Sequence, residues 1–318
     1  MSLRQHASLW AYQLLTRVLQ LALPWKLAKR ARQEPGYAWR VDARFGRYGH
    51  KPHTQRDWLW VHAVSLGETR ACAPLVTALR TAYPGARLLL THGTATGLEA
   101  GKALLQAGDE QTWLPWDSAS AVHGFLQHYK PRLGLLMETE VWPQLALSCA
   151  AMRVPLYLVN ARMSQRSLAK AQRLNALSSL AFGALAGAVA QTEADAQRLQ
   201  ALGARILGVA GNLKFDVSPN AALVAQGTQL GQRWAKPVVM FASSRDTEEV
   251  MWLQALAQLP ATERAQAQWL IVPRHPQRVA QVEQLLLAAG WRVSRRSNWA
   301  TGADAQLEPQ VLPAPVCV

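Results

Sequence analysis

Carboxylates follow two runs of apolar residues in this sequence. Glu68 follows the segment 62–67, in which Gly67 permits a tight turn, and it falls in the first turn of an expected helix. Glu138 and Glu140 leave a second apolar run together. A positioned carboxylate can take a proton from a hydroxyl group as a general base. Because the helix dipole favours one acid in any first turn, the pair is stronger evidence for a site than Glu68 alone.

Hydroxyl groups and cations occupy similar positions farther along the chain. The loop 90–97 is rich in small and hydroxyl residues, including Thr94, and suits close approach by a polar ligand, although it is not a Walker loop. Four cations each follow an expected strand and can neutralise phosphate or carboxylate groups: Arg162, Lys214, Arg245 and Arg274. Taken singly, each is more often a surface charge.

The elements that must position these residues alternate between strand and helix. From Trp58 onward, short runs rich in Leu and Val alternate with segments of helical period, which is typical of βαβ units around a parallel sheet. The expected strands are 58–64, 87–91, 133–137, 155–160, 186–190 and 206–209. The expected helices are 68–82, 95–106, 118–128, 141–151, 165–180 and 193–202. A complete doubly wound α/β domain is predicted before residue 212.

A second alternation begins after Ser218 and Pro219. Its expected elements are a helix at 220–233, a strand at 237–242, a helix at 246–258, a strand at 268–272 and a helix at 276–289. The predicted organisation is a basic N-terminal segment (1–45), a first α/β domain (46–217) and a second (218–318). Two such domains facing each other would form a cleft at the carboxyl ends of their strands, where anions bind easily. The proline-containing tail after residue 300 is expected to be irregular.

The N-terminal segment combines an apolar helix with a polar stripe. Within residues 9–23 the polar side chains recur at helical spacing: Gln13, Thr16, Arg17 and Gln20. A spanning helix needs about 20 apolar residues and would bury Arg17, whereas an interfacial helix keeps this stripe in water. We therefore expect a helix that lies in, or is partly inserted into, a membrane surface. A helix that simply docks on the folded protein is the alternative.

Basic residues are concentrated beside this helix. The chain of 318 residues carries a net charge of +14, and residues 1–56 hold eleven Lys and Arg against two acids. A cluster directly after the helix would attract anionic lipid on the cytoplasmic side: Lys26, Lys29, Arg30 and Arg32. The polar interruptions and the lack of a small-residue cleavage site argue against a signal peptide. Binding to nucleic acid is less favoured, because the charge adjoins an apolar segment.

Cysteine and histidine spacings do not indicate a disulfide framework or a metal site. The three cysteines lie far apart without a CxxC pair, which fits a reducing compartment. Among the eight histidines, His50 and His53 are close in sequence, and His123 and His128 fall in one expected helix. A spacing of five does not align two ligands on one helical face. We expect no structural metal.

Five motifs in order resemble the 3-deoxy-D-manno-octulosonic acid (Kdo) transferase family. They are HAVSLGE at 62–68, METEVWP at 137–143, VNARMS at 159–164, GNLKFD at 211–216 and VPRHP at 272–276. The segments 35–37 and 44–46 also resemble the stretch after the family's membrane anchor. The resemblance extends along nearly the whole chain, and so many motifs in one order are improbable by chance.

This resemblance implies a two-domain GT-B glycosyltransferase that needs no metal or other cofactor. It would move Kdo with inversion from CMP-Kdo to a lipid A precursor, lipid IVA, while anchored at the cytoplasmic face of the inner membrane. By similarity Glu68 is the base, and the remaining motif positions bind substrate: Ser65, Gly67, Thr94, Glu138, Glu140, Arg162, Lys214, Ser244, Arg274 and His275.

The sequence departs from the family in two places. Ser244 is followed by Arg245, where many relatives have a hydroxyl residue followed by His. The family's Gly-Gly-His-Asn loop, which precedes Leu-Glu-Pro and holds the nucleotide, is not found, so we expect a chain that stops short, with an incomplete second domain and uncovered apolar faces. Two alternatives stay open: a membrane-binding remnant that has lost CMP binding, and another sugar-nucleotide transferase of the same layout.

Overall fold

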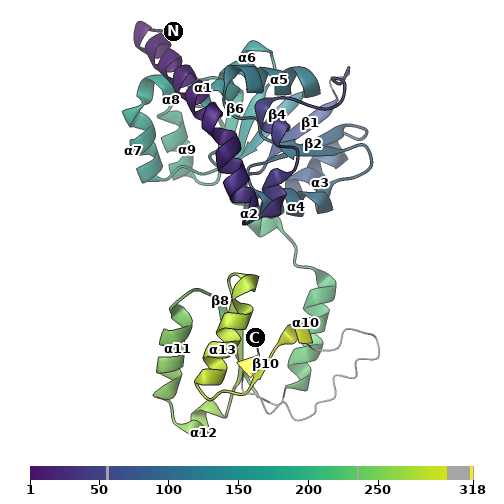
Figure 1. Ribbon diagram of the computed structural model, residues 1–318, viewed down its shortest axis with the longest axis vertical. Helices are drawn as coiled ribbons and strands as arrows, with labels where there is room; N and C mark the ends of the chain where they lie inside the picture. Colours follow the sequence, from purple (N-terminus) through teal and green to yellow (C-terminus); the bar gives the residue numbers. More distant parts are fainter. Residues whose placement is uncertain (55–56, 235, 299–315, 318) are drawn as a thin grey trace. The chain divides into compact units, whose positions relative to one another are not determined.

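The computed structural model describes residues 1–54, 57–234, 236–298 and 316–317. The chain divides into two compact units, Met1–Ser218 and Pro219–Val318 (Figure 1). The segment 1–45, predicted as a region of its own, belongs to the first unit. Most of the tail after residue 300 lies outside the described residues.

The first unit is built on a parallel sheet of seven strands. The strands are β1 (Trp58–His62), β2 (Arg87–His92), β3 (Glu110–Trp113), β4 (Leu133–Met137), β5 (Leu156–Ala161), β6 (Gly187–Ala190) and β7 (Ile206–Val209). Their order is β3-β2-β1-β4-β5-β6-β7, the doubly wound arrangement of Rossmann-type domains. The predicted fold class is therefore confirmed.

One strand, β3, was not predicted. It begins with Glu110 and Gln111, and only Thr112 and Trp113 are buried, so its sequence contains no apolar run. It is an edge strand that pairs with β2 alone, which explains why its first half tolerates polar side chains.

Helices cover both faces of this sheet. They are α2 (Leu66–Ala71), α3 (Ala73–Ala82), α4 (Ala95–Gly101), α5 (Ala119–Tyr129), α6 (Pro143–Ala151), α7 (Gln165–Arg173), α8 (Asn175–Gly183) and α9 (Glu193–Gln200). Trp58 and Trp60 point into one core cluster and Val61 into the other, as the alternation of side chains along a strand requires. The single helix expected over 68–82 is two helices, because Pro74 cannot donate a helical hydrogen bond and stands at the start of α3.

The N-terminal helix α1 (Leu3–Ala31) lies across the outside of the first unit, and its N-terminal end extends beyond the neighbouring elements (Figure 1). Leu23 and Leu27 are buried in a cluster with Tyr37 of the short helix η1 (Pro35–Ala38), and a second turn, η2 (Val41–Phe45), follows. Within the described residues, no helix combines the length and hydropathy that a membrane span would need.

The polar stripe of α1 faces the protein, so the expectation that it stays in water is wrong at its centre. Thr16 is only 5% exposed, and Gln13 donates to the side-chain oxygen of Gln144 on α6 (2.9 Å). The hydroxyl of Tyr12 donates to the buried carboxylate of Asp117 (2.7 Å). Gln13 and Tyr12 thus have partners in other elements, and the hydroxyl of Thr16 donates to the carbonyl oxygen of Gln13 within α1 (3.1 Å), which allows the stripe to be buried. The apolar side of α1 is left facing outward.

The second unit holds a smaller parallel sheet in the order β10-β11-β9-β8. Its elements are α10 (Ala221–Arg233), β8 (Val238–Ser244), α11 (Glu248–Ala257), α12 (Ala261–Arg264), β9 (Gln268–Pro273), α13 (Val279–Ala288), β10 (Val293–Ser294) and β11 (Val316–Cys317). The predicted helices and strands are present here within a few residues. The tail was expected to be irregular, yet Val316–Cys317 pairs with both β10 and β9. The core of the unit gathers around Trp269, Ile271 and Leu286.

Candidate active site

The sheet of the first unit reverses its winding direction between β1 and β4. Ligands of open α/β sheets bind outside the carboxyl ends of the strands at such a switch point. Glu68 follows β1, and Glu138 and Glu140 follow β4, so the three predicted carboxylates flank it. The structure therefore brings them to one edge, as the sequence predicted.

Glu68 is half-buried and held in one orientation. Its Oε2 accepts a hydrogen bond from the backbone N–H of Val64 (2.9 Å), and its Oε1 accepts one from the hydroxyl of Ser65 (3.0 Å). Ser65 caps α2 and also accepts from the backbone N–H of Glu68 (3.4 Å). Each carboxylate oxygen has two lone pairs, so both retain acceptor capacity for a ligand hydroxyl.

The environment of Glu68 stabilises the protonated form of its carboxyl group, relative to the same group in water. Burial raises the pKa of the Glu68 carboxyl, and the negative charges of Glu138 and Glu140 raise it further, against the lowering effect of the bonds from Val64 and Ser65. Glu140 has a raised pKa for the same first reason, burial, partly offset by the Trp142 indole N–H that donates to its Oε2 (3.0 Å). Acids tuned in this way cluster at catalytic sites.

Backbone strain marks the same edge. Glu138 at the end of β4 has φ +57° and Asn160 near the end of β5 has φ +50°. Left-handed conformations are uncommon for residues other than glycine, and strain of this kind gathers where a fold positions functional groups. Asn160 is buried; its Oδ1 accepts from the N–H of Leu213 (3.1 Å), while its Nδ2 has no hydrogen-bond partner among the described residues.

Lys214 reaches the acidic group from the short helix η4 (Leu213–Asp216). Its Nζ lies 3.6 Å from Oε1 of Glu138, and half of its side chain stays exposed. The ammonium group therefore balances one of the carboxylates and can still contact an anionic ligand. Asn160 fixes the start of this turn through its bond to Leu213. This bond brings Lys214 close to Glu138, although the two are more than fifty positions apart.

The loop after β2 contacts the loop that carries Glu68. The hydroxyl of Thr94 donates to the carbonyl oxygen of Val64 (2.9 Å) and accepts from the N–H of Gly97 (3.1 Å). A side chain at Gly97 would come within 2.9 Å of that carbonyl oxygen, so glycine is needed there. Gly67 differs, because a Cβ there would meet only ordinary contact at 3.9 Å. The fold itself does not require glycine at position 67.

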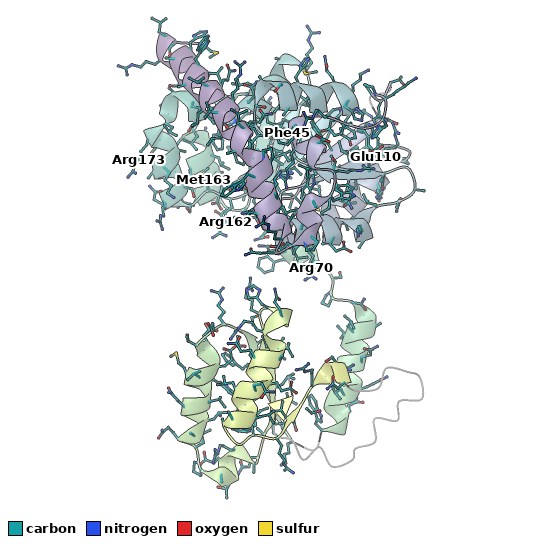
Figure 2. All side chains as sticks on the ribbon, in the orientation of Figure 1. Phe45, Arg70, Glu110, Arg162, Met163 and Arg173 are labelled. Carbon is teal, nitrogen blue, oxygen red and sulfur yellow. The ribbon has the colours of Figure 1, made fainter. Side chains whose placement is uncertain are left out.

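Arg162 follows β5 and is exposed; its carbonyl oxygen accepts from the hydroxyl of Thr139 (2.8 Å), which joins the β4 and β5 loops. In Figure 2, Arg162 and Arg70 of α2 lie at one end of the first unit, and Glu110 at the start of β3 lies apart from them. The predicted residues of this unit are thus gathered around neighbouring strand ends.

Three predicted residues belong to the second unit. Ser244 ends β8, is fully buried, and donates its hydroxyl to Oε1 of Glu249 (2.7 Å). The backbone N–H of Arg274, just after β9, donates to the carbonyl oxygen of Ser244 (2.9 Å), and the side chains of Arg274 and His275 are exposed. These residues form their own group at the carboxyl ends of β8 and β9. As in the first unit, a strained residue, Ser243 with φ +60°, stands at this strand end.

Two residues at these strand ends, Asn160 and Glu249, were not among the predicted site residues. Asn160 stands in the motif 159–164, and the known tolerance of Asn for left-handed conformation was the available signal. Glu249 is almost fully buried and bonded to Arg278 (2.9 Å from Oε1), a partner 29 positions away that spacing cannot reveal.

The strand order, the switch-point acids and the strained strand ends define a Rossmann-type α/β protein with an acidic, lysine-bearing site. The model of the family described as 3-deoxy-D-manno-octulosonic-acid transferase (kdotransferase) matches residues 39–217. This range covers more than half of the chain and all of the site residues of the first unit. The chain belongs to this family.

Named relatives agree with that assignment. The chain is 43% identical to a 3-deoxy-D-manno-octulosonic acid transferase of Bordetella pertussis over 86% of its length, and 30% identical to the Haemophilus influenzae protein of that name over 84%. It spans 65% and 63% of the lengths of these relatives. A crystal structure of a candidate UDP-N-acetylglucosamine 2-epimerase from Listeria monocytogenes is similar in fold, with a TM-score of 0.50, 15% identity, and coverage of 74% of this chain and 66% of that one.

Proposed function

We propose that this chain is an inverting glycosyltransferase that moves Kdo from CMP-Kdo to a lipid A precursor, lipid IVA, in lipopolysaccharide synthesis. The observation that carries the proposal is the position of Glu68: a half-buried, oriented carboxylate at the switch point of a Kdo transferase family domain. Further support comes from the two carboxylates and the lysine beside it.

In the proposed reaction Glu68 accepts the proton of an acceptor hydroxyl. The hydroxyl oxygen forms a bond to the anomeric carbon of Kdo while the bond from that carbon to the CMP phosphate oxygen breaks, and CMP leaves with the electron pair. The bonds from Val64 and Ser65 hold the carboxylate in place during this transfer. Glu138 and Glu140 would orient sugar hydroxyls, and Gly67 would leave room for the acceptor. The chain's own groups supply base and cations, so the proposal requires no metal.

The anionic donor would be bound by cations and hydroxyls. Arg162 and Lys214 in the first unit and Arg274 and His275 in the second are exposed and can contact carboxylate or phosphate groups. Thr94 and Ser244 already hold loops in place through their hydroxyls, so their proposed contribution to binding is mainly through the backbone they position.

The lipid acceptor would be met at a membrane surface on which α1 lies. Large apolar side chains of α1 recur on the side turned away from the protein: Leu3, Trp10, Leu14, Val18, Leu21 and Trp25. Leu21 is 84% exposed and Trp10 76%. A contiguous exposed apolar face is typical of membrane-binding sites, and adjacent exposed basic residues would contact anionic lipid at the cytoplasmic face of the inner membrane.

The catalytic proposal is tested with the purified chain in detergent, CMP-Kdo and tetra-acylated lipid A precursor. Product mass should increase by Kdo units, and Glu68→Gln should slow turnover by at least about 100-fold, the usual contribution of a general base. Glu99→Gln is the matched control, because Glu99 is an exposed acid on α4 in the same unit. Equal rates for wild type and Glu68→Gln would contradict the proposed base.

Nucleotide protection separates the proposal from its two alternatives. A Kdo transferase should be stabilised against heat by CMP more than by UDP, since a ligand that binds only the folded state raises Tm. Protection by UDP instead would favour a different sugar-nucleotide transferase. No protection by CMP, with binding to lipid vesicles intact, would favour a membrane-binding remnant.

Membrane binding is tested with vesicles that contain anionic phospholipid. The chain should sediment with them, and Trp10→Ser combined with Leu21→Ser should release it, because both changes remove apolar surface that is largely exposed. Thr77→Ser, an exposed position on α3, serves as control. Unchanged sedimentation of the double variant would contradict the proposed role of α1.

A further inference from the structure

Three histidines from separate parts of the chain meet in the first unit. His50 and His53 lie in the segment that leads into β1, and His128 lies in the last turn of α5. One potential ligand nitrogen from each ring lies within 4.8 Å of the other two. The backbone N–H of His53 also donates to the carbonyl oxygen of His128 (2.8 Å), which fixes the segment against the helix. Spacing along one helix could not reveal this cluster, because its third member arrives through tertiary structure.

Two ring nitrogens of this cluster are buried without a hydrogen-bond partner in the part of the chain that the structure describes. Nε2 of His53 and Nε2 of His128 are both buried from solvent, and neither makes a hydrogen bond among the described residues. Unpartnered buried nitrogens are costly unless something occupies them, and imidazole nitrogens are common metal ligands.

A carboxylate stands beside the histidines. Oε1 of Glu110 lies 3.3 Å from Nε2 of His53, without hydrogen-bond geometry, and Oε2 lies 3.8 Å from Nε2 of His50. In a tetrahedral zinc site with metal–ligand bonds of about 2.1 Å, neighbouring ligand atoms are about 3.4 Å apart. The two Glu110 distances are close to this value, and the histidine nitrogens, which lie within 4.8 Å of one another, would move closer on binding a shared ion. The negative charge of Glu110 would offset that of a divalent cation.

Aromatic packing holds the rings in position. Tyr48 stacks on His128 with ring centroids 4.2 Å apart, and Tyr129 stacks on His53 at 5.6 Å. Trp58 meets His53 edge to face at 5.0 Å. Ligands whose orientation is fixed by their surroundings lose little freedom on metal binding.

The cluster lies at the amino ends of the strands, since His53 precedes β1, Glu110 begins β3 and His128 precedes β4. Glu68 and its neighbours occupy the opposite, carboxyl edge. We propose that His50, His53 and His128, with Glu110 beside them, bind a divalent transition-metal ion of the zinc class that ties the segment before β1 to α5 and β3. Imidazole with one carboxylate is a donor set suited to such ions. The role is structural, and it is independent of the proposed transferase activity.

The test uses the full chain purified without a polyhistidine tag and stripped with a chelator. Co²⁺ is added as a spectroscopic probe, followed by competing Zn²⁺. We expect one equivalent of Co²⁺ to produce the visible d–d absorption of a tetrahedral site, Zn²⁺ to displace it, and Tm to rise with Zn²⁺. His50→Gln and His128→Gln should abolish the absorption, and Glu110→Gln should weaken binding by about 10- to 100-fold.

His123→Gln is the matched control, because His123 is an exposed histidine on α5, the same helix as His128. It should bind like wild type. His50 is partly exposed, so His50→Gln remains informative if His128→Gln does not fold, as judged by circular dichroism. Absence of the cobalt absorption in the folded wild type, or an unchanged absorption in folded His50→Gln, would overturn the proposal.

Discussion

The two units differ in how completely the side chains of their sheets are buried. In the first, every residue of β1 is buried, and helices bury apolar side chains on both faces of the sheet. In the second, β8 is an edge strand along which Val238, Val239 and Met240 are all substantially exposed. Buried apolar area drives folding, so the described part of the first unit should be the more robust of the two.

Core truncation provides the largest contrast between the units. Leu136→Ala on β4 removes a fully buried side chain and should lower the free energy of unfolding by about 2–5 kcal/mol. Met240→Ala on β8 removes an exposed side chain and should change it by no more than about 0.5 kcal/mol. Urea unfolding followed by circular dichroism measures both. Comparable losses would mean that β8 is covered in solution.

A smaller effect is expected where α1 docks on the first unit. Tyr12→Phe removes the hydroxyl that donates to Asp117, and a hydrogen bond to a charged group contributes about 1.5–3 kcal/mol. Hydrogen exchange of the α1 amides should accelerate while the sheet amides keep their protection. Arg17→Gln, an exposed change on the same helix, should leave exchange unaltered. Fast exchange of α1 already in wild type would contradict the docked arrangement.

The smallest expected effect is a loss of stability in the second unit at acid pH. Burial raises the pKa of Glu249, but the bonds from Arg278 and Ser244 outweigh it, and the folded-state pKa lies below the ordinary value. Its stabilising contribution is therefore present above the unfolded pKa of about 4.3 and is lost as the pH falls through the lower folded value. Hydrogen exchange of α11 measured against pH should show this loss in wild type, and Glu249→Gln should reduce it. An identical pH dependence in both would exclude Glu249 as the cause.

The pKa shift of Glu68 has the opposite sign to that of Glu249. Its raised pKa means that the folded state holds this proton more tightly than the unfolded chain does, so its contribution to stability increases as the pH falls through the folded pKa. A carboxylate that costs stability when ionised is expected at a site selected for chemistry, whereas Glu249 is tuned for structure.

The sequence predicted the elements that depend on local pattern. The apolar runs of β1, β4 and β9 identify strands by composition alone, and the convergence of Glu68 with Glu138 follows from parallel strands sharing one edge. β3 was not predicted, because it is a strand through its pairing with β2 and its own sequence contains no apolar run. The sequence of α1 revealed two faces, but which face packs depends on partners such as Asp117, more than a hundred positions away.

The fine geometry of the site also lay beyond sequence reasoning. The left-handed backbone at Glu138 follows from the surrounding fold, since glutamate has little preference for it. The bond from Asn160 to Leu213 and the meeting of His50 with His128 join segments distant in sequence. The spacing of residues along the sequence does not predict such contacts.

The most direct test of the central claim is the pH profile of turnover with CMP-Kdo and lipid A precursor. A base must be deprotonated to act, so turnover should fall on the acid side with an apparent pKa above the ordinary glutamate value of about 4.3, and Glu140→Gln should move that fall to lower pH by removing a neighbouring negative charge. An acid limb that is unmoved in Glu140→Gln and still present in Glu68→Gln would contradict the assignment of Glu68 as the base.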